Sequence, residues 1–265
     1  MTTQGPRPAI DSTRPHPARV YDYLLGGKDH YLVDEEVARR MPQEAQAAAR
    51  QNRAFMRRAM AFVAGYGVDQ FLDIGTGIPT EPNLHQVVQG IAPASRVVYV
   101  DNDPIVLRHA EALLVSTEQG ATDYIEADVR KPQVILGRAR ELLDFARPVC
   151  VSLVALMHFI RDEEDPYGIV RGFVDALPSG SWLVLTHGTF DFVPVHALDP
   201  GHEPRRMAPY TDHITATARS RDAVLRFFDG LELVEPGLVA AVQWRNDDAA
   251  PPQPSGMFAG VARVP

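Results

Sequence analysis

The chain has 265 residues, 45% of them hydrophobic, and a formal net charge of −8. This composition is enough to bury a substantial core, and no apolar run reaches the roughly 20 residues that a membrane-spanning helix requires. The 26 basic residues are spread along an acidic chain, which argues against a nucleic-acid partner and favours small molecules or proteins. A membrane protein and a nucleic-acid-binding protein are therefore not expected.

The N-terminal quarter differs in pattern from the rest. Residues 1–17 are rich in proline and polar residues and contain no apolar signal segment, which predicts a flexible arm and a cytoplasmic protein. Residues 18–66 follow a helical pattern that is ended by Gly65 and Gly67. We expect a helical lid or extension there, and one domain over residues 67–265.

Apolar runs of strand length then alternate with segments of helix length. The expected strands are 70–74, 96–101, 123–128, 149–156 and 181–187, and the expected helices are 83–91, 104–116, 132–145 and 165–177. This alternation predicts a parallel sheet, and right-handed crossovers make it doubly wound. Cys150, the single cysteine, lies in the fourth apolar run and is expected to be a buried strand residue.

The regular alternation stops after Thr186. Residues 188–217 are rich in Pro, His and Asp, and they predict a long insertion on the substrate side, because simple connections are shorter. A helix at 221–228 and strands at 231–236 and 256–264 close the chain, and these two strands are expected to pair antiparallel at one edge. The predicted fold class is α/β, with a doubly wound, mostly parallel sheet of seven strands, an antiparallel edge and an N-terminal helical extension.

A glycine-rich loop follows the first strand of this sheet. In the sequence FLDIGTGIPT, the strand ends at Asp73 and runs directly into Gly75, Thr76 and Gly77. Glycines at this point let the backbone approach a ligand, and open α/β sheets bind ligands at the carboxyl ends of their strands. The alternative is a purely structural turn between strand and helix, because glycine is common in turns.

Two more strand ends carry acidic residues beside the same crevice. Asp101 ends the second strand, where a carboxylate can accept both hydroxyls of a ribose, and Asp128 ends the third, where it could accept an adenine amine. Each residue alone could instead cap a helix. Three acidic strand ends together are better explained by one ligand.

These motifs resemble those of class I S-adenosylmethionine-dependent methyltransferases. The blocks VYDYLLGGKDHY, FLDIGTGIPT, VVYVDNDPIVL and VALMHFIRDEEDPYGIV, with RFFDGLELVEPGL, further resemble a bacterial family of such enzymes long catalogued as a domain of unknown function, from about Arg19 onward. The resemblance implies that the loop binds the methionine portion, the second acid the ribose and the third the adenine of S-adenosyl-L-methionine. The cofactor-binding residues implied around these motifs are Asp73, Gly75, Thr76, Gly77, Asp101, Asn102, Asp128 and Val129.

The segment from Tyr21 to Tyr31 holds two adjacent glycines and three tyrosines and is expected to be irregular. One hypothesis is that it folds over the cofactor as a lid, with Tyr23, Gly26 and Lys28 in contact with it and with Tyr23 or Tyr31 offering a ring face or hydroxyl to its cationic group. A desolvated contact between a tyrosine ring and the cationic sulfonium could contribute about 2 kcal/mol. The alternative is a connection that packs its tyrosines on the core.

Two histidines are candidates for a general base. His158 follows the fourth strand, in a stretch (LMHFIRDEED) that resembles the His-containing segment of small-molecule O-methyltransferases, and His187 ends the fifth strand as a second candidate. The alternative for His158 is a hydrogen bond to its own loop. The nine histidines have no metal-ligand spacing, so no metal is expected.

The sequence therefore favours methyl transfer from S-adenosyl-L-methionine to an unidentified, small-molecule acceptor. A non-catalytic cofactor-binding sensor or partner module would have the same fold. A nicotinamide-dependent oxidoreductase is disfavoured because Gly77 is followed by Ile78, Pro79 and Thr80, without the third glycine of G-x-G-x-x-G, and because Asp73 would repel a diphosphate. The sequence leaves the acceptor atom and the oligomeric state open.

Overall fold

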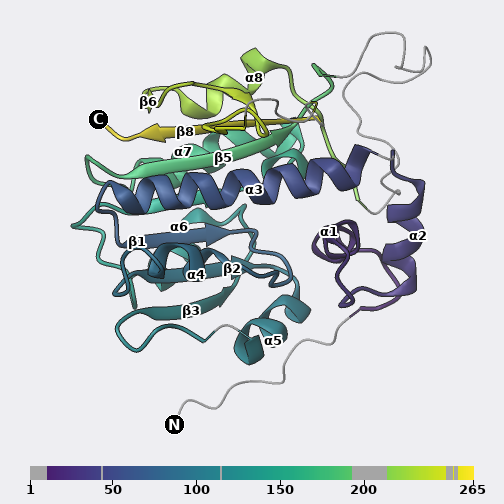
Figure 1. Ribbon diagram of the computed structural model, residues 1–265, viewed down its shortest axis with the longest axis horizontal. Helices are drawn as coiled ribbons and strands as arrows, with labels where there is room; N and C mark the ends of the chain where they lie inside the picture. The colour runs from purple at the N-terminus through teal and green to yellow at the C-terminus, as the bar shows by residue number, and fades with distance from the viewer. Residues whose placement is uncertain (1–10, 43, 114, 193–213, 249–252, 254–255) are drawn as a thin grey trace.

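The computed structural model describes residues 11–42, 44–113, 115–192, 214–248, 253 and 256–265 (Figure 1). Its strands form one sheet in the order β3-β2-β1-β4-β5-β8-β6, and β7 pairs with β8 outside this path. β1 to β5 are parallel, and β8 is antiparallel to β5 and β6. The strands are β1 (Gln70–Ile74), β2 (Arg96–Asp101), β3 (Ala121–Glu126), β4 (Cys150–Leu153), β5 (Trp182–Gly188), β6 (Glu232–Leu233), β7 (Val239–Ala240) and β8 (Met257–Arg263).

The helices alternate with the parallel strands, as the sequence predicts. In chain order, the helices are α1 (Pro17–Leu25), α2 (Leu32–Arg40), α3 (Glu44–Gly65), α4 (Leu84–Gln89), α5 (Pro104–Leu113), α6 (Pro132–Ala139), α7 (Pro166–Val174) and α8 (Arg221–Leu225). Short 3₁₀ turns follow β4 and α8: η1 (Met157–Phe159), η2 (Asp162–Glu164) and η4 (Arg226–Phe228). Both η1 and η2 lie at the carboxyl end of β4, where a ligand site is expected.

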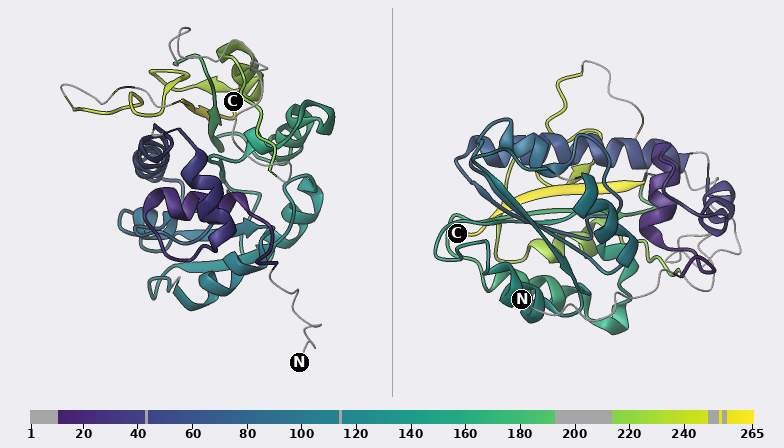
Figure 2. Two further views of the ribbon diagram at one scale, coloured as in Figure 1. Left: turned by 90° about the vertical axis from the view of Figure 1, so that its right-hand side faces the viewer. Right: turned by 90° about the horizontal axis from the view of Figure 1, so that it is seen from below.

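Helices cover both faces of the sheet, so alternate strand residues enter two different cores. In β2, Val98 and Val100 belong to the core formed with α6, α7 and α8, whereas Val97 and Tyr99 belong to the core formed with α3, α4 and α5. The right-hand view of Figure 2 shows α3 on one side of the strands and the teal and green helices on the other. Parallel strands covered on both faces have continuous apolar sequences, which is why they are easy to locate.

Helices α1 and α2 lie beside the carboxyl ends of the parallel strands, to the right of the sheet in Figure 1. α1 has Pro17 at its first position and ends where Gly26 adopts a left-handed φ of 85°. A Cβ atom on Gly27 would lie 1.9 Å from Oδ1 of Asp22, so a larger residue there would displace the Asp22 carboxylate. A small apolar cluster then joins α1 and α2 to the first part of α3.

The α/β class, the mostly parallel doubly wound sheet and its antiparallel edge are confirmed. Several element ends differ from the prediction. Tyr21–Leu25 belong to α1, so the expectation of irregular chain was wrong there, because the helix continues until Gly26. The third strand ends at Glu126, so Asp128 lies beyond it, and the fourth ends at Leu153. β7 was not predicted, because two residues are too few to give a periodic signal.

Parts of the predicted arm and insertion, residues 1–10 and 193–213, lie outside the described residues. Among the helices that are described, none has the length and apolar character needed to cross a bilayer. Cys150 is fully buried, as expected, and its burial raises the pKa of the thiol. It is a structural residue of β4 rather than a reactive thiol.

Candidate active site

The glycine loop after β1 is bound directly to the end of β2. The amides of Gly75 and Thr76 donate to the carbonyl of Val100 at 2.8 and 3.2 Å, and the amide of Gly77 donates to Oδ2 of Asp101 at 2.9 Å. Gly75 and Gly77 have φ values of 75° and 67°, which are unfavourable for residues with a Cβ. The structure therefore brings together the loop and Asp101, two of the three predicted motifs.

The two glycines keep space for close contacts on either side of the loop. A Cβ atom on Gly75 would lie 2.8 Å from a methyl carbon of Leu156, which follows β4. A Cβ atom on Gly77 would meet nothing nearer than the Cβ of Ala18 in α1, at 4.0 Å. The loop thus lies between the chain after β4 and helix α1, with room for a ligand beside Gly77.

Asp101 is 9% exposed and presents a carboxylate at the end of β2. Its Oδ1 accepts from the amide of Asp103 and its Oδ2 from the amide of Gly77, both at 2.9 Å. Burial raises the pKa of Asp101, and these two amide hydrogen bonds lower it by less. Each carboxylate oxygen has a second lone pair, so Asp101 can still accept hydroxyl donors such as those of a ribose.

Asp73 lies at the end of β1, beside the same loop. Burial raises the pKa of Asp73 to about 6, while the nearby Ser152 and Arg53 lower it by less. The charge of Asp101 also raises it. Asp73 is therefore a carboxylate at neutral pH that gains from a cationic ligand, because a nearby positive charge favours the ionised form.

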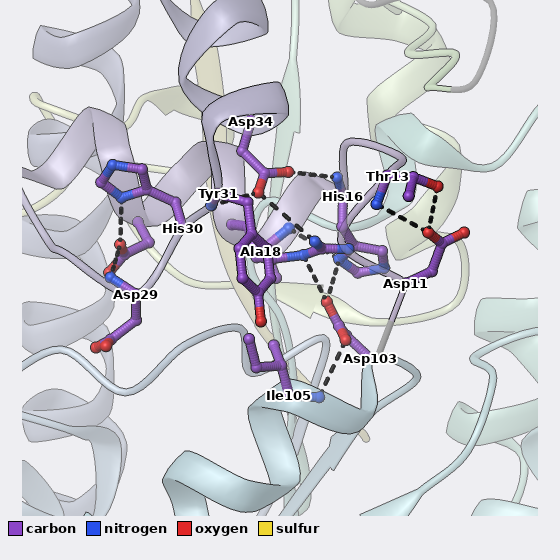
Figure 3. Close-up of polar contacts among 12 residues, drawn as sticks. Asp11, Thr13, His16, Ala18, Asp29, His30, Tyr31, Asp34, Asp103 and Ile105 are labelled. Carbon is purple, nitrogen blue, oxygen red and sulfur yellow. Dashed lines mark hydrogen bonds and ion pairs between the residues drawn. The ribbon is translucent and has the colours of Figure 1, made fainter. Parts of the chain in front are cut away.

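A buried cluster of charged side chains holds α1 against the chain that follows Asp101 (Figure 3). Nε of Arg19 lies 3.2 Å from Oδ2 of Asp103, and Nη1 of Arg19 lies 3.6 Å from Oδ2 of Asp34. Nδ1 of His16 lies 3.1 Å from the same oxygen of Asp103. The side chains of Arg19, Asp34 and Asp103 are at most 4% exposed, so each charge is stabilised by the opposite charges of the cluster rather than by hydration. Sequence reasoning missed this cluster, because charges at helical spacing are usually solvated.

The predicted residues of the N-terminal segment have clear structural roles. Gly26 is the left-handed cap of α1, and the side chain of Lys28 is exposed. The ring of Tyr23 lies edge-on to that of His30, with centroids 5.0 Å apart. Contact of these residues with a cofactor stays a prediction.

The predicted residues after β2 and β3 lie near the crevice in different surroundings. Asn102 is exposed beside Asp101, and Val129 is buried. Asp128 accepts from the amide of Arg130 at 2.9 Å and forms an ion pair with its guanidinium at 3.2 Å. An adenine amine would therefore share Asp128 with Arg130.

Arg219 fixes the turns that follow β4. Its guanidinium donates to the carbonyl oxygens of Met157 and Ile160 at 3.2 and 2.9 Å, and to the carboxylate of Asp162 at 2.6 Å. The Arg219 side chain is only 3% exposed. Because one rigid guanidinium holds three points of this chain, η1 and its histidine are firmly positioned.

The two candidate bases differ in how their ring nitrogens are used. Nη1 of Arg219 donates to Nε2 of His187 at 2.8 Å, and since arginine cannot accept, this nitrogen carries no proton. Nδ1 of His187 therefore donates to the carbonyl of Gly188 at 2.8 Å, which leaves no free lone pair. In contrast, Nδ1 of His158 is buried and has no hydrogen-bond partner among the described residues. Burial, and to a lesser degree the charge of Arg219, lower the pKa of His158 to about 3.

The sequence matches a known family over almost its whole length. Residues 3–265 match the family described as S-adenosyl methyltransferase. The chain belongs to this family. It is thus an S-adenosyl-L-methionine-dependent methyltransferase, as the resemblance of its motifs implied, and the fold agrees with that class.

Two solved structures of similar proteins support the family membership. A protein of the DUF574 family from Streptomyces avermitilis MA-4680 is 44% identical, with a TM-score of 0.89 over 97% of this chain and 100% of that chain. A proposed methyltransferase from Thermobifida fusca YX is 35% identical, with a TM-score of 0.83 over 98% of both chains. No curated protein sequence matches the chain.

The residues in the crevice of this methyltransferase suit its cofactor. S-adenosyl-L-methionine carries a sulfonium and an ammonium, and two carboxylates, the partly buried Asp73 and the buried Asp101, lie beside the glycine loop. The open side of Gly77 leaves space for a ligand against the loop. Asn52 adds a buried oxygen that has no hydrogen-bond partner within the described part of the chain.

This arrangement predicts that cofactor affinity depends on pH. Asp73, with a pKa of about 6, loses its charge as the pH falls through 6, and its attraction for the cofactor's cationic groups is lost with it. Below pH 6 the Kd for S-adenosyl-L-methionine should rise by up to about tenfold per pH unit, measured by calorimetry between pH 5 and 8. Asp101, His16 and Arg53 also face this region, so the control is Asp73→Asn, whose weaker binding should have a flatter pH profile. A wild-type Kd that is constant from pH 5 to 8 would contradict the assignment.

Proposed function

We propose that the methyl acceptor is a small molecule that binds beside His158, under the N-terminal helices. The observation that carries this proposal is the buried Nδ1 atom of His158, which has no hydrogen-bond partner in the described residues. An unpaired buried polar atom is costly, so it is best explained by a ligand group that pairs with it. A site this enclosed suits a small acceptor better than the surface of a macromolecule.

Bound S-adenosyl-L-methionine supplies an electrophilic methyl group on its sulfonium. The protein's contribution is to hold the acceptor in line with that group and to exclude water. With a pKa of about 3, His158 is neutral at physiological pH and is a weak base. We therefore propose that it accepts a hydrogen bond from the acceptor's N–H or O–H and orients it, rather than removing a proton beforehand. Acceptors that are nucleophilic without full deprotonation, such as amines, fit this site best.

The surroundings of His158 support an enclosed acceptor site. Phe159, the next residue, packs against the apolar cluster that joins α1 to α2, and Ile214 belongs to the same cluster. The backbone of His158 accepts from the amide of Thr217 at 2.7 Å. We propose that α1 and α2 act as a lid over both the cofactor and the acceptor.

The role of His158 predicts a specific kinetic pattern. Replacing His158 by phenylalanine keeps a ring of similar size but removes the hydrogen bond, so turnover should fall by about 10- to 100-fold while the Kd for S-adenosyl-L-methionine stays within twofold. The measurement is formation of S-adenosylhomocysteine with a panel of small amines, phenols and carboxylic acids. With saturating S-adenosyl-L-methionine, kcat of the wild-type enzyme should show no titration of imidazole between pH 5 and 8, because the pKa of His158 is about 3.

Two results would contradict the proposal. Equal turnover by His158→Phe and the wild-type enzyme would exclude contact of His158 with the acceptor. Turnover with a protein fraction, and with no member of the panel, would replace the small-molecule acceptor by a macromolecule. His109→Phe is a suitable control, because its side chain is 27% exposed and lies on α5 beside Asp29, outside the residues proposed to bind the acceptor.

A further inference from the structure

Helix α3 brings an amide and a guanidinium to the edge of the glycine loop. Nη2 of Arg53 donates to the carbonyl oxygens of Thr80 and Pro82, the latter at 3.1 Å, so its side chain reaches the chain just after Gly77. These two bonds use only one of the three guanidinium nitrogens. The other two form no hydrogen bond with the described residues.

The charge of Arg53 is near Asp73 but not paired with it. Asp73 acts on the pKa of Arg53, and Arg53 acts on that of Asp73, so the two charges face one region. Within the described residues, however, Arg53 forms no ion pair at 4.0 Å or less. Burial lowers the pKa of Arg53, which is the expected effect on a cation removed from water. Arg53 and Asp73 are both partly buried, and a cation and a carboxylate that form no ion pair leave room for a ligand carrying both opposite charges.

The neighbouring Asn52 adds an acceptor in a fixed orientation. The hydroxyl of Tyr21 donates to the carbonyl of Ala49 at 3.0 Å, so it must accept from Asn52, whose Nδ2 lies 2.9 Å away. This network assigns the amide orientation. Oδ1 of Asn52 then points away from Tyr21, and it is buried without a hydrogen-bond partner in the described residues, on a side chain that is 1% exposed.

Helix α1 places Tyr21 and Asn52 close to the glycine loop. A Cβ atom on Gly77 would lie 4.0 Å from that of Ala18, and Tyr21 follows Ala18 by three residues, so Tyr21 and Ala18 lie on the same face of α1. Asn52 bonds to that tyrosine and is adjacent in sequence to Arg53, which bonds to the chain just after the loop. The amide oxygen, the guanidinium and the Asp73 carboxylate therefore gather around one end of the cofactor crevice.

We propose that Asn52, Arg53 and Asp73 form a subsite for the amino-acid end of S-adenosyl-L-methionine. Arg53 binds the α-carboxylate through its free N–H groups, and Oδ1 of Asn52 and the carboxylate of Asp73 accept from the α-ammonium. Charge-assisted hydrogen bonds of this kind are stronger than neutral ones. The inference concerns the cofactor alone and does not depend on the acceptor or on the role of His158.

Binding of cofactor fragments tests this subsite without turnover. Isothermal titration would compare S-adenosylhomocysteine with 5′-methylthioadenosine, which has no amino-acid group, and with decarboxylated S-adenosylmethionine. For Arg53→Gln, the Kd for S-adenosylhomocysteine should rise by about 10- to 100-fold, while the Kd for methylthioadenosine should stay within twofold. Arg57→Gln is the matched control, because Arg57 is an exposed cation one turn further along α3, and it should bind both ligands like the wild-type protein.

Other variants separate the subsite from a structural role. Asn52→Leu should weaken S-adenosylhomocysteine binding more than Tyr21→Phe, which removes the hydroxyl bonded to Nδ2 of Asn52 and to the Ala49 carbonyl but leaves Oδ1 of Asn52 in place. Equal losses for S-adenosylhomocysteine and methylthioadenosine in Arg53→Gln would overturn the proposal, since the arginine would then only shape the loop through Thr80 and Pro82. If Arg53→Gln does not fold, ligand binding by the wild-type protein tests the proposal instead. It should bind decarboxylated S-adenosylmethionine at least tenfold more weakly than S-adenosyl-L-methionine, and equal affinities would overturn the proposal.

Discussion

Replacing Asp101 by alanine is expected to weaken the binding of S-adenosyl-L-methionine by roughly tenfold to hundredfold. The carboxylate is 9% exposed at the end of β2, and hydrogen bonds to a charged group contribute about 1.5–3 kcal/mol. The substitution also removes the acceptor of the amides of Gly77 and Asp103, so the loop and the chain after β2 lose a shared contact. Calorimetric titration with S-adenosyl-L-methionine measures the loss directly.

Two further variants separate ribose binding from loop support. Asp101→Asn keeps one acceptor oxygen and the side-chain shape, so its loss of affinity should be smaller than that of Asp101→Ala. Asp123→Ala removes an exposed carboxylate from β3 and should leave the Kd unchanged. A loss below about threefold in Asp101→Ala would remove the ribose assignment.

The parallel sheet could be predicted because burial on both faces leaves continuous apolar runs. Val97 to Val100 enter two cores in alternation, and every residue of this run is apolar. Short or edge elements give weaker signals. β6 and β7 have two residues each, and their pairing is set by contact with β8 rather than by a local pattern.

The cofactor motifs could be predicted because glycines and acids at strand ends are rare without a ligand. The amide of Gly75 donates to the carbonyl of Val100 and the amide of Gly77 to the carboxylate of Asp101, so the loop and the end of β2 are joined as a shared site requires. Asn52 and Arg53 could not be found in this way, because polar residues on a helix normally face water. Only the fold shows that this turn of α3 lies against the glycine loop.

The sequence could not show which of the two histidines has a free ring nitrogen, because that depends on tertiary contacts. His158 follows β4 and His187 lies at the end of β5, and their sequences do not say which ring nitrogen is occupied. Arg219, which follows His187 by 32 residues, donates a hydrogen bond to Nε2 of His187. It also bonds to the carbonyl of Met157 and so positions the turn that carries His158. A lone arginine after the predicted insertion has no sequence signature, so this discrimination depends on tertiary contact alone.

Replacing Arg19 by methionine should strongly destabilise the N-terminal helices. The change leaves the carboxylates of Asp34 and Asp103 buried without their guanidinium, and removal of one partner from a buried ion pair typically costs about 3–5 kcal/mol. For a protein of this size, that corresponds to a fall in Tm on the order of 10 °C, measured by scanning calorimetry without cofactor. Cofactor affinity should fall as well, since Asp103 is bound to Asp101 through its amide.

An exposed arginine on the neighbouring helix provides the matched control. Arg39 pairs with Glu35 within α2 and with the hydroxyl of Tyr23 in α1, but its side chain is 66% exposed, so Arg39→Met should change stability by less than about 1 kcal/mol. Helices α1 and α2 can also detach without global unfolding, in which case hydrogen exchange in Arg19→Met rises in α1 and α2 and not in the sheet. Unchanged stability and unchanged exchange protection in Arg19→Met would mean that water solvates Asp34 and Asp103 in place of the guanidinium. The charged cluster would then not be what holds α1 and α2 in place.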